Sequence, residues 1–228
     1  MCKLVPTLAD VATTQDAPDA GGARASRIRR TREAIVSAAL ELAAEEPDRR
    51  LTADHIAERA GVSRRTFFNY FPSVEAAFFA PVQQLLVVAV EHLERVPAGT
   101  PLADALTQAM TGAAEDEPLE RLGLCAHLGS RMPQFGGSEL EQWDAADALL
   151  TEAFQRRYPH LEPFTARCLT GALIGVSRAA IHEWDSRTGG RPSARSATLL
   201  HDLIADSLRH IASGFTDAVD AGQPGPHA

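Results

Sequence analysis

The chain has 228 residues, which is enough for one large domain or two small ones. Its 45% hydrophobic content can fill a packed core, and no apolar run approaches the length that crosses a bilayer. Residues 1–6 lack the apolar stretch of a signal peptide, and three cysteines cannot form a disulfide framework. These features exclude membrane-spanning proteins and disulfide-stapled domains, and we expect a cytoplasmic protein.

The net charge of −8 is unevenly distributed along the chain. Residues 24–75 hold ten arginines against eight acids, whereas residues 76–228 hold eleven arginines against nineteen acids. Five of these arginines fall within residues 24–32, where there is no acid. The asymmetry predicts one end that faces DNA and another that repels it. A solvated basic terminus is the alternative interpretation of the arginine cluster.

Residues 1–23 are polar and contain several glycines and prolines, so we expect a disordered tail. Apolar residues at helical spacing then predict a first helix over about residues 27–46, because a proline follows at position 47. Arg27 and Arg29 lie at its start, where we expect them to meet the DNA backbone.

Residues 52–71 predict two short helices joined by a tight turn. Thr52 is a good N-cap for the first helix, and Asp54 adds favourable negative charge to its first turn. Gly61 ends that helix, because glycine adopts the left-handed conformation without a clash. Ser63 caps the second helix, so the pattern is that of a helix-turn-helix.

The second helix carries side chains that suit DNA. Phe67 and Phe71 are four residues apart and are expected to face the core together. The remaining side chains then point outward. We expect base contacts from Arg64, Arg65, Thr66 and Asn69, and phosphate contacts from Thr52, Ser63, Tyr70, Arg27 and Arg29. An ordinary helical hairpin with a solvated polar face is the alternative.

The same segment resembles the N-terminal domain of the TetR family of bacterial transcription regulators. The matching residues are Leu51-Thr52, Ile56-Ala57, Ala60-Gly61-Val62-Ser63, Thr66-Phe67-Phe68, Tyr70-Phe71-Pro72-Ser73 and Glu75. Phe68 stands where the family often has tyrosine, and Val74 where it usually has a lysine that meets phosphate. The resemblance implies a DNA-binding regulator whose C-terminal half binds a small-molecule ligand and forms a homodimer.

The remainder of the chain predicts further helices and no strands. Ser73 caps a fourth helix, which Pro81 should kink or divide. The later helices are expected at residues 101–114, 117–131, 139–157, 162–185 and 194–217. The last two have more apolar surface than one chain needs to bury, which favours a four-helix dimer interface. Packing within a single chain is the alternative.

Neither a catalytic constellation nor a metal-ligand spacing stands out, so we expect no enzyme activity, no cofactor and no metal. A small-molecule pocket is more plausible, because pockets combine apolar walls with a few polar groups. Its candidate residues are Phe135, Trp143, Cys168, Arg178 and His182. Ordinary core packing is the alternative for the aromatic ones.

Together these features predict an all-α, homodimeric repressor that binds a pseudo-palindromic double-stranded DNA operator and is released by a small-molecule effector. We expect a disordered tail at 1–23, a helix-turn-helix domain at 24–75, a helical ligand-binding and dimerisation domain at 76–218, and a flexible tail at 219–228. A helical ligand- or partner-binding module with weakened DNA function is the alternative, which Val74 favours slightly.

Overall fold

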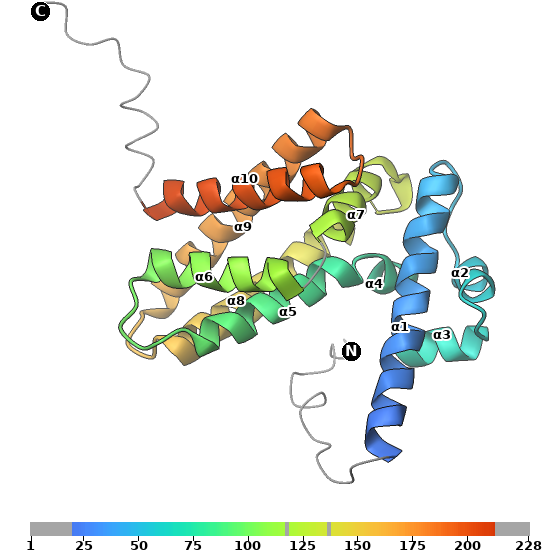
Figure 1. The fold of residues 1–228 in the computed structure, drawn as a ribbon, viewed down its shortest axis with the longest axis horizontal. Helices are drawn as coiled ribbons and strands as arrows, with labels where there is room; N and C mark the ends of the chain where they lie inside the picture. The colour runs from blue at the N-terminus through green and yellow to red at the C-terminus, as the bar shows by residue number, and fades with distance from the viewer. Residues whose placement is uncertain (1–19, 117–118, 136–137, 213–228) are drawn as a thin grey trace, which may run out of the picture.

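A computed structural model describes residues 20–116, 119–135 and 138–212 (Figure 1). All secondary structure within these ranges is helical, which confirms the all-α prediction. The helices are α1 (Ala20–Glu45), α2 (Ala53–Arg59), α3 (Arg64–Tyr70), α4 (Val74–Phe78), α5 (Ala80–Arg95), α6 (Leu102–Asp116), α7 (Leu119–Arg131), the 3-10 helix η2 (Pro133–Phe135), α8 (Ser138–Arg157), α9 (Pro163–Thr188) and α10 (Ala194–Ala212).

Helix α1 separates the two parts of the molecule. Figure 1 shows α2 and α3 on one side of α1, and α5 to α10 on the other. The N-terminal end of α1 extends beyond α3 in this view. The helix starts seven residues earlier than the predicted residue 27, despite the helix-disfavouring glycines at positions 21 and 22. The arginine cluster therefore lies on a regular helix.

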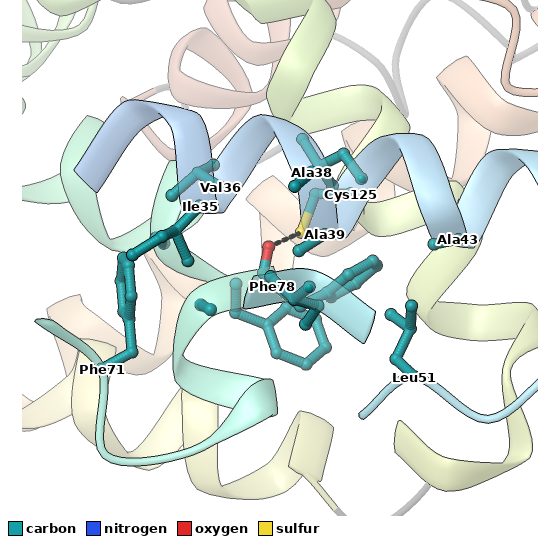
Figure 2. Close-up of a cluster of buried hydrophobic side chains, with 14 of the residues drawn as sticks. Ile35, Val36, Ala38, Ala39, Ala43, Leu51, Phe71, Phe78 and Cys125 are labelled. Atoms are coloured by element: carbon teal, nitrogen blue, oxygen red, sulfur yellow. Dashed lines mark hydrogen bonds between the residues drawn. The ribbon is translucent and has the colours of Figure 1, made fainter. Parts of the chain in front are cut away.

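The first of two hydrophobic cores joins α1–α4 to the end of α7 and to η2 (Figure 2). Ile35 and Ala39 of α1, Ile56 of α2, Phe67 of α3 and Phe78 of α4 are fully buried in it. From the later part of the chain it receives Cys125, Leu128, Met132 and Phe135. Phe135 stacks on Phe78 with ring centroids 4.4 Å apart. This core therefore contains residues that lie more than fifty positions apart in the sequence.

The second core lies among α5–α10. Its largest fully buried side chain is Trp184 of α9, whose indole N–H donates to the backbone oxygen of Ser196 at 2.7 Å. Phe154 of α8 and Leu200 of α10 are also fully buried there. The Ser196 carbonyl thus provides a hydrogen-bond acceptor for the indole N–H, which is the only polar group of the buried tryptophan side chain.

Pro81 divides the predicted fourth helix, as expected. Helix α4 ends at Phe78 and α5 begins at Ala80, with Pro81 in the first turn, where proline is tolerated. The later helices agree with their predicted ranges to within a few residues over the described parts of the chain. Residues 1–19 and 213–228, which include most of both predicted tails, lie outside the described residues.

Candidate nucleic-acid interface

Two side-chain caps and one glycine fix the angle between α2 and α3. The Thr52 hydroxyl accepts from the backbone N–H of His55 at 3.3 Å, and the Ser63 hydroxyl accepts from that of Thr66 at 3.0 Å. Between the helices, Gly61 has a φ of +67°, a conformation that costs other residues free energy. The predicted caps and turn residue therefore occupy their expected positions.

The inner face of α3 is anchored by aromatic rings. Phe67 is fully buried and Phe71 is 3% exposed, and their ring centroids lie 6.2 Å apart. The guanidinium carbon of Arg32 lies 4.5 Å from the Phe71 centroid, which connects α1 to the end of α3. Burial lowers the pKa of Arg32 from its ordinary value, so this arginine serves packing as well as charge.

The outer face of α3, defined by Arg64, Arg65, Phe68 and Asn69, is exposed. Three of these are predicted base-contacting side chains, whereas Phe68 is exposed beside them although no DNA contact is predicted for it. Thr66 and Tyr70 are half-buried, and Tyr70 packs against the first core. The Thr66 hydroxyl also lies 2.8 Å from that of Ser63. These two residues are therefore less outward-facing than the helical spacing indicated.

The arginine cluster lies on the exposed part of α1. Arg24, Arg27, Arg29 and Arg30 are all exposed, as is Ile28 among them. Predicted phosphate ligands Thr52 and Ser63 lie at the N-termini of α2 and α3, where backbone N–H groups also face outward. Their hydroxyl oxygens accept cap hydrogen bonds, which leaves the hydroxyl hydrogen of Thr52 for donation to an acceptor, whereas the Ser63 and Thr66 hydroxyls share one hydrogen bond and have one hydroxyl hydrogen left between them.

Val74, which replaces the family's usual lysine, is the first residue of α4. It is half-buried and packs against the first core. Ser73 caps the helix by accepting from the backbone N–H of Ala76 at 3.1 Å. The valine therefore contributes to packing at a position where a lysine would supply a charge.

Within the described ranges, three residues of α7 and η2 make polar contacts with the N-terminal part of the chain. Arg121 of α7 pairs with Glu33 of α1 and donates to the Ser37 hydroxyl at 2.8 Å. The thiol of Cys125 donates to the backbone oxygen of Phe78 at 3.3 Å (Figure 2). Burial raises the pKa of Cys125, so the thiol remains protonated and serves as a donor.

The third contact is made by the segment after α7. The backbone N–H of Leu51, just before α2, donates to the side-chain oxygen of Gln134 in η2 at 2.8 Å. Since Phe135 is packed against Phe78, η2 contacts both the entry to α2 and the start of the link to α5. Helix α7 and η2 therefore form a second connection between the two halves, beside the direct one from α4 to α5.

The predicted ligand-binding residues are not brought together. Phe135 is 1% exposed in the first core, whereas Cys168, Arg178 and His182 are exposed on α9. The side chain of Trp143 lies outside the described residues. A hollow between α6 and α10 has room for about one water molecule. It is lined by other residues, among them Thr107, Met110, His201 and Leu208.

Helix α9 has an exposed side, which we call the outer face of α9. It comprises Phe164, Cys168, Gly171, Gly175, Arg178, Ala179 and His182. Phe164 is 71% exposed, more than any other large apolar side chain in the described ranges. Within those same ranges, no helix is long and apolar enough to span a membrane, and no three His, Cys, Asp or Glu side chains are grouped so that they could hold a metal ion.

Residues 35–80 match the family model described as bacterial regulatory proteins, tetR family. The chain is 27% identical over 210 residues to the HTH-type transcriptional regulator TcmR of Streptomyces glaucescens, a match that covers 88% of this chain and 92% of TcmR. It is 26% identical over 182 residues to the HTH-type transcriptional regulator EthR of Mycobacterium tuberculosis, covering 75% of this chain and 82% of EthR.

The fold is similar to that of Thermus thermophilus FadR, a TetR-family transcriptional repressor solved in complex with lauroyl-CoA. The TM-score is 0.52 at 23% identity, and the match covers 86% of this chain and 98% of FadR. The family match spans the helices that present the outer face of α3, and its members are regulators rather than enzymes. Residues 35–80 are thus a tetR-family regulatory domain, and the chain, which is similar over most of its length to the regulator TcmR, is a DNA-binding transcriptional regulator.

Proposed function

We propose that this regulator is a homodimeric repressor that binds a pseudo-palindromic operator and is released from it by a small-molecule ligand. The observation that carries the proposal is the exposed set of Arg64, Arg65 and Asn69 on a helix fixed by two caps and a buried aromatic pair. A rigid helix with exposed arginine and asparagine side chains is suited to base edges in a major groove.

We assign phosphate contacts to the residues around that helix. Arg27 and Arg29 are exposed on α1, and Thr52 and Ser63 cap the two helices that approach DNA. Tyr70 is half-buried, so only its hydroxyl end is suited to a phosphate. Thr66 remains a candidate for a base contact. A regulator of this kind acts where the bacterial chromosome is, so we place it in the cytoplasm.

The outer face of α9 supports the dimer. An exposed phenylalanine beside glycines and an alanine offers an apolar surface that another helix can approach closely. A two-fold pair of such surfaces would set the spacing of the two DNA-binding units to about one helical turn of DNA, or 34–36 Å. We propose residues 76–218 as the dimerisation and ligand-binding domain, and residues 24–75 as the DNA-binding domain.

Release by a ligand requires a route from the C-terminal helices to α1–α3. The direct link from α4 to α5 supplies one, and the contacts of Arg121, Cys125 and Gln134 supply another. A ligand bound among α5–α8 that shifted α7 would change how α1 and the entry to α2 are held. A hundredfold loss of operator affinity needs about 2.7 kcal/mol of coupling, which is in the usual range.

The effector site lies, in this proposal, among the C-terminal helices. FadR is solved with lauroyl-CoA, a ligand much larger than the hollow between α6 and α10. A ligand of that size would fit this hollow only if α6 and α10 moved apart, which is consistent with binding that changes the conformation. The candidates Phe135, Trp143, Cys168, Arg178 and His182 stay predictions.

The test is binding of the purified chain to duplex DNA from upstream of its own gene, against shuffled DNA, at physiological salt. A specific complex that resists competitor DNA is expected. Arg27→Ala should weaken binding to all sequences and flatten the salt dependence by about one unit, because it removes one phosphate contact. Arg65→Ala should instead relax the preference at one base position.

The second candidate function is a ligand- or partner-binding module with weakened DNA function, favoured by Val74 in place of lysine. Binding that is weak, salt-sensitive and blind to sequence, both upstream of the gene and across the genome, would support it against the repressor. Equal ligand affinity for free and DNA-bound protein would contradict release by a ligand.

A further inference from the structure

Asp54 and Arg64 connect the N-terminal ends of α2 and α3. Asp54 lies in the first turn of α2, and Arg64 is the first residue of α3. The Nη1 atom of Arg64 donates to Oδ2 of Asp54 at 2.6 Å, and both side chains are more than half exposed. The pair thus lies at the surface that the two helix N-termini share.

Phe68 lies beneath the same arginine, one helical turn along α3. The guanidinium carbon of Arg64 is 5.5 Å from the Phe68 ring centroid. Phe68 is held in turn by the buried Phe67, since their rings meet edge to face with centroids 5.2 Å apart. It is nevertheless 46% exposed. Arg64 therefore has a carboxylate on one side and a fixed aromatic ring on another.

Stability explains only part of these contacts. Asp54 places favourable negative charge in the first turn of α2, but it needs no pairing with Arg64 to do so. An ion pair between exposed side chains contributes little to folding, and an exposed phenylalanine leaves apolar surface in water. An acid at a DNA-facing helix end also repels phosphate. The two contacts instead restrict the Arg64 guanidinium before DNA binds. This restriction reduces the side-chain entropy that a flexible arginine loses when it is immobilised on a target.

The donors of Arg64 allow this restricted group to bind a base. The hydrogen bond to Asp54 uses Nη1 and leaves the edge formed by Nε and Nη2. Two parallel donors are what the O6 and N7 atoms of guanine accept in the major groove. The exposed edge of Phe68, four residues further along α3, is suited to the C5-methyl group of thymine.

We infer that Asp54 is a positioning residue that orients Arg64 toward a guanine, and that Phe68 contacts the methyl group of a thymine within about two base pairs of it. This inference rests on the proposed operator binding and deepens it, because it assigns part of the half-site sequence. Asp54 itself touches no base. Its effect on specificity passes entirely through Arg64.

The test starts from sites that the full chain selects from a pool of random duplex DNA. Relative affinities for every single-base variant of the selected half-site are then measured for the parent, Asp54→Ala, Arg64→Ala and the double variant. The preference for guanine at one position should fall about tenfold in Asp54→Ala. Arg64→Ala should lose preference at that same position, and the double variant should lose no more than Arg64→Ala.

Glu58→Ala is the matched control, because Glu58 is an exposed acid one turn further along α2. It should keep the parent's base preferences. Asp54→Ala should bind unrelated DNA as well as the parent or better, since it has lost a negative charge. Ratios between DNA sites are compared within each variant, so a change in folding cancels. Unchanged guanine preference in Asp54→Ala, or an equal change in Glu58→Ala, would overturn the role of Asp54.

The Phe68 contact is tested by replacing each thymine of the site with uracil, which lacks only the methyl group. The parent should lose affinity several-fold at one thymine, and Phe68→Ala should be insensitive to the same replacement. If uracil weakens both proteins equally at every thymine, Phe68 makes no methyl contact. A parent that selects no site overturns the proposed function itself, whereas a parent that selects one without these effects overturns only this inference.

Discussion

Gln134 and Leu51 lie 83 positions apart in the sequence, and the side-chain oxygen of Gln134 accepts from the backbone N–H of Leu51 at 2.8 Å. Leu51 is 5% exposed and directly precedes Thr52, the N-cap of α2. A buried backbone N–H just before a helix has few acceptors within reach, so the hydrogen bond from Leu51 to Gln134 contributes to stability. It also makes the start of the helix-turn-helix depend on a residue of the C-terminal half.

Replacing Gln134 with alanine should leave the Leu51 N–H without its acceptor. The expected cost is about 1–3 kcal/mol of unfolding free energy, measured by chemical denaturation. Gln108→Ala on the exposed side of α6 is the control and should stay within about 0.5 kcal/mol of the parent. If the two alanine variants were equally stable, the Leu51 pairing would contribute nothing.

The two glycines after α9 allow the cost of a left-handed backbone to be measured separately from the cost of a side-chain overlap. Gly189 and Gly190 have φ values of +61° and +71°, but only at Gly190 would an added Cβ meet another side chain, 2.0 Å from the His127 ring. Gly189→Ala should therefore cost about 1–2 kcal/mol. Gly190→Ala adds the overlap and should cost about 1–3 kcal/mol more.

His127 has little room to move aside, because its ring pairs with Asp185 of α9. Thermal unfolding of the two glycine variants is the measurement. Equal melting temperatures would mean that the His127 ring adjusts freely, contrary to the packing described above.

A single charged substitution tests whether the outer face of α9 forms the dimer interface. Phe164→Asp places an acid in the first turn of α9, where the helix dipole favours it, so the fold should be retained. The charge should nonetheless oppose dimer formation, because an apolar contact would have to bury it. Sedimentation should show a lower dimer fraction at equal protein concentration.

Leu102→Asp is the control for that experiment. Leu102 is 38% exposed at the first position of α6, so the substitution places the same charge at the start of another helix. Its dimer fraction should equal that of the parent. A Phe164→Asp variant that is as dimeric as the parent would place the dimer interface elsewhere.

Glu45 and Arg59 connect the end of α1 to the end of α2 and predict a pH dependence. Arg59 donates from Nη2 and Nη1 to the two carboxylate oxygens of Glu45, at 2.7 and 3.0 Å. This pairing lowers the pKa of Glu45 below its ordinary value. A lowered pKa in the folded state means stability that is present above the ordinary glutamate pKa and is lost as the pH falls through the folded value.

Glu45→Gln should accordingly be less stable than the parent at neutral pH, and the difference should shrink in acid. Denaturation curves collected at neutral pH and on the acid side would show this. A difference that stays constant with pH would contradict the ionic origin of the contact. Because the Glu45 side chain is more than half exposed and that of Arg59 about one third exposed, the effect should also weaken with added salt.

Local signals in the sequence were sufficient for most of the helices. Thr52, Gly61 and Ser63 each have a short-range physical role, and the structure places all three as expected. Pro81 divides the fourth helix because its ring conflicts with the preceding turn. Such features depend on neighbours a few residues away, so sequence patterns report them.

Contacts between distant segments were not predicted. The stacking of Phe135 on Phe78 and the pairing of Arg121 with Glu33 have no periodicity that would reveal them. The sequence makes Phe135 a candidate for a ligand pocket, although an aromatic residue at helical spacing is more often part of the core, where the structure places it. Phe68 was noted only as a departure from the family pattern, because its contact with Arg64 depends on the side-chain orientation.

The first core has a consequence for how such a regulator can be rebuilt. Cys125, Leu128, Met132 and Phe135 close one wall of the core that holds α1–α4. Residues 24–80 transplanted onto the C-terminal half of another regulator would face side chains that are not shaped for Phe78 and Leu51. A working chimera would have to carry the end of α7 and η2 along with the helix-turn-helix, so the exchangeable unit is a set of packed surfaces rather than a stretch of sequence.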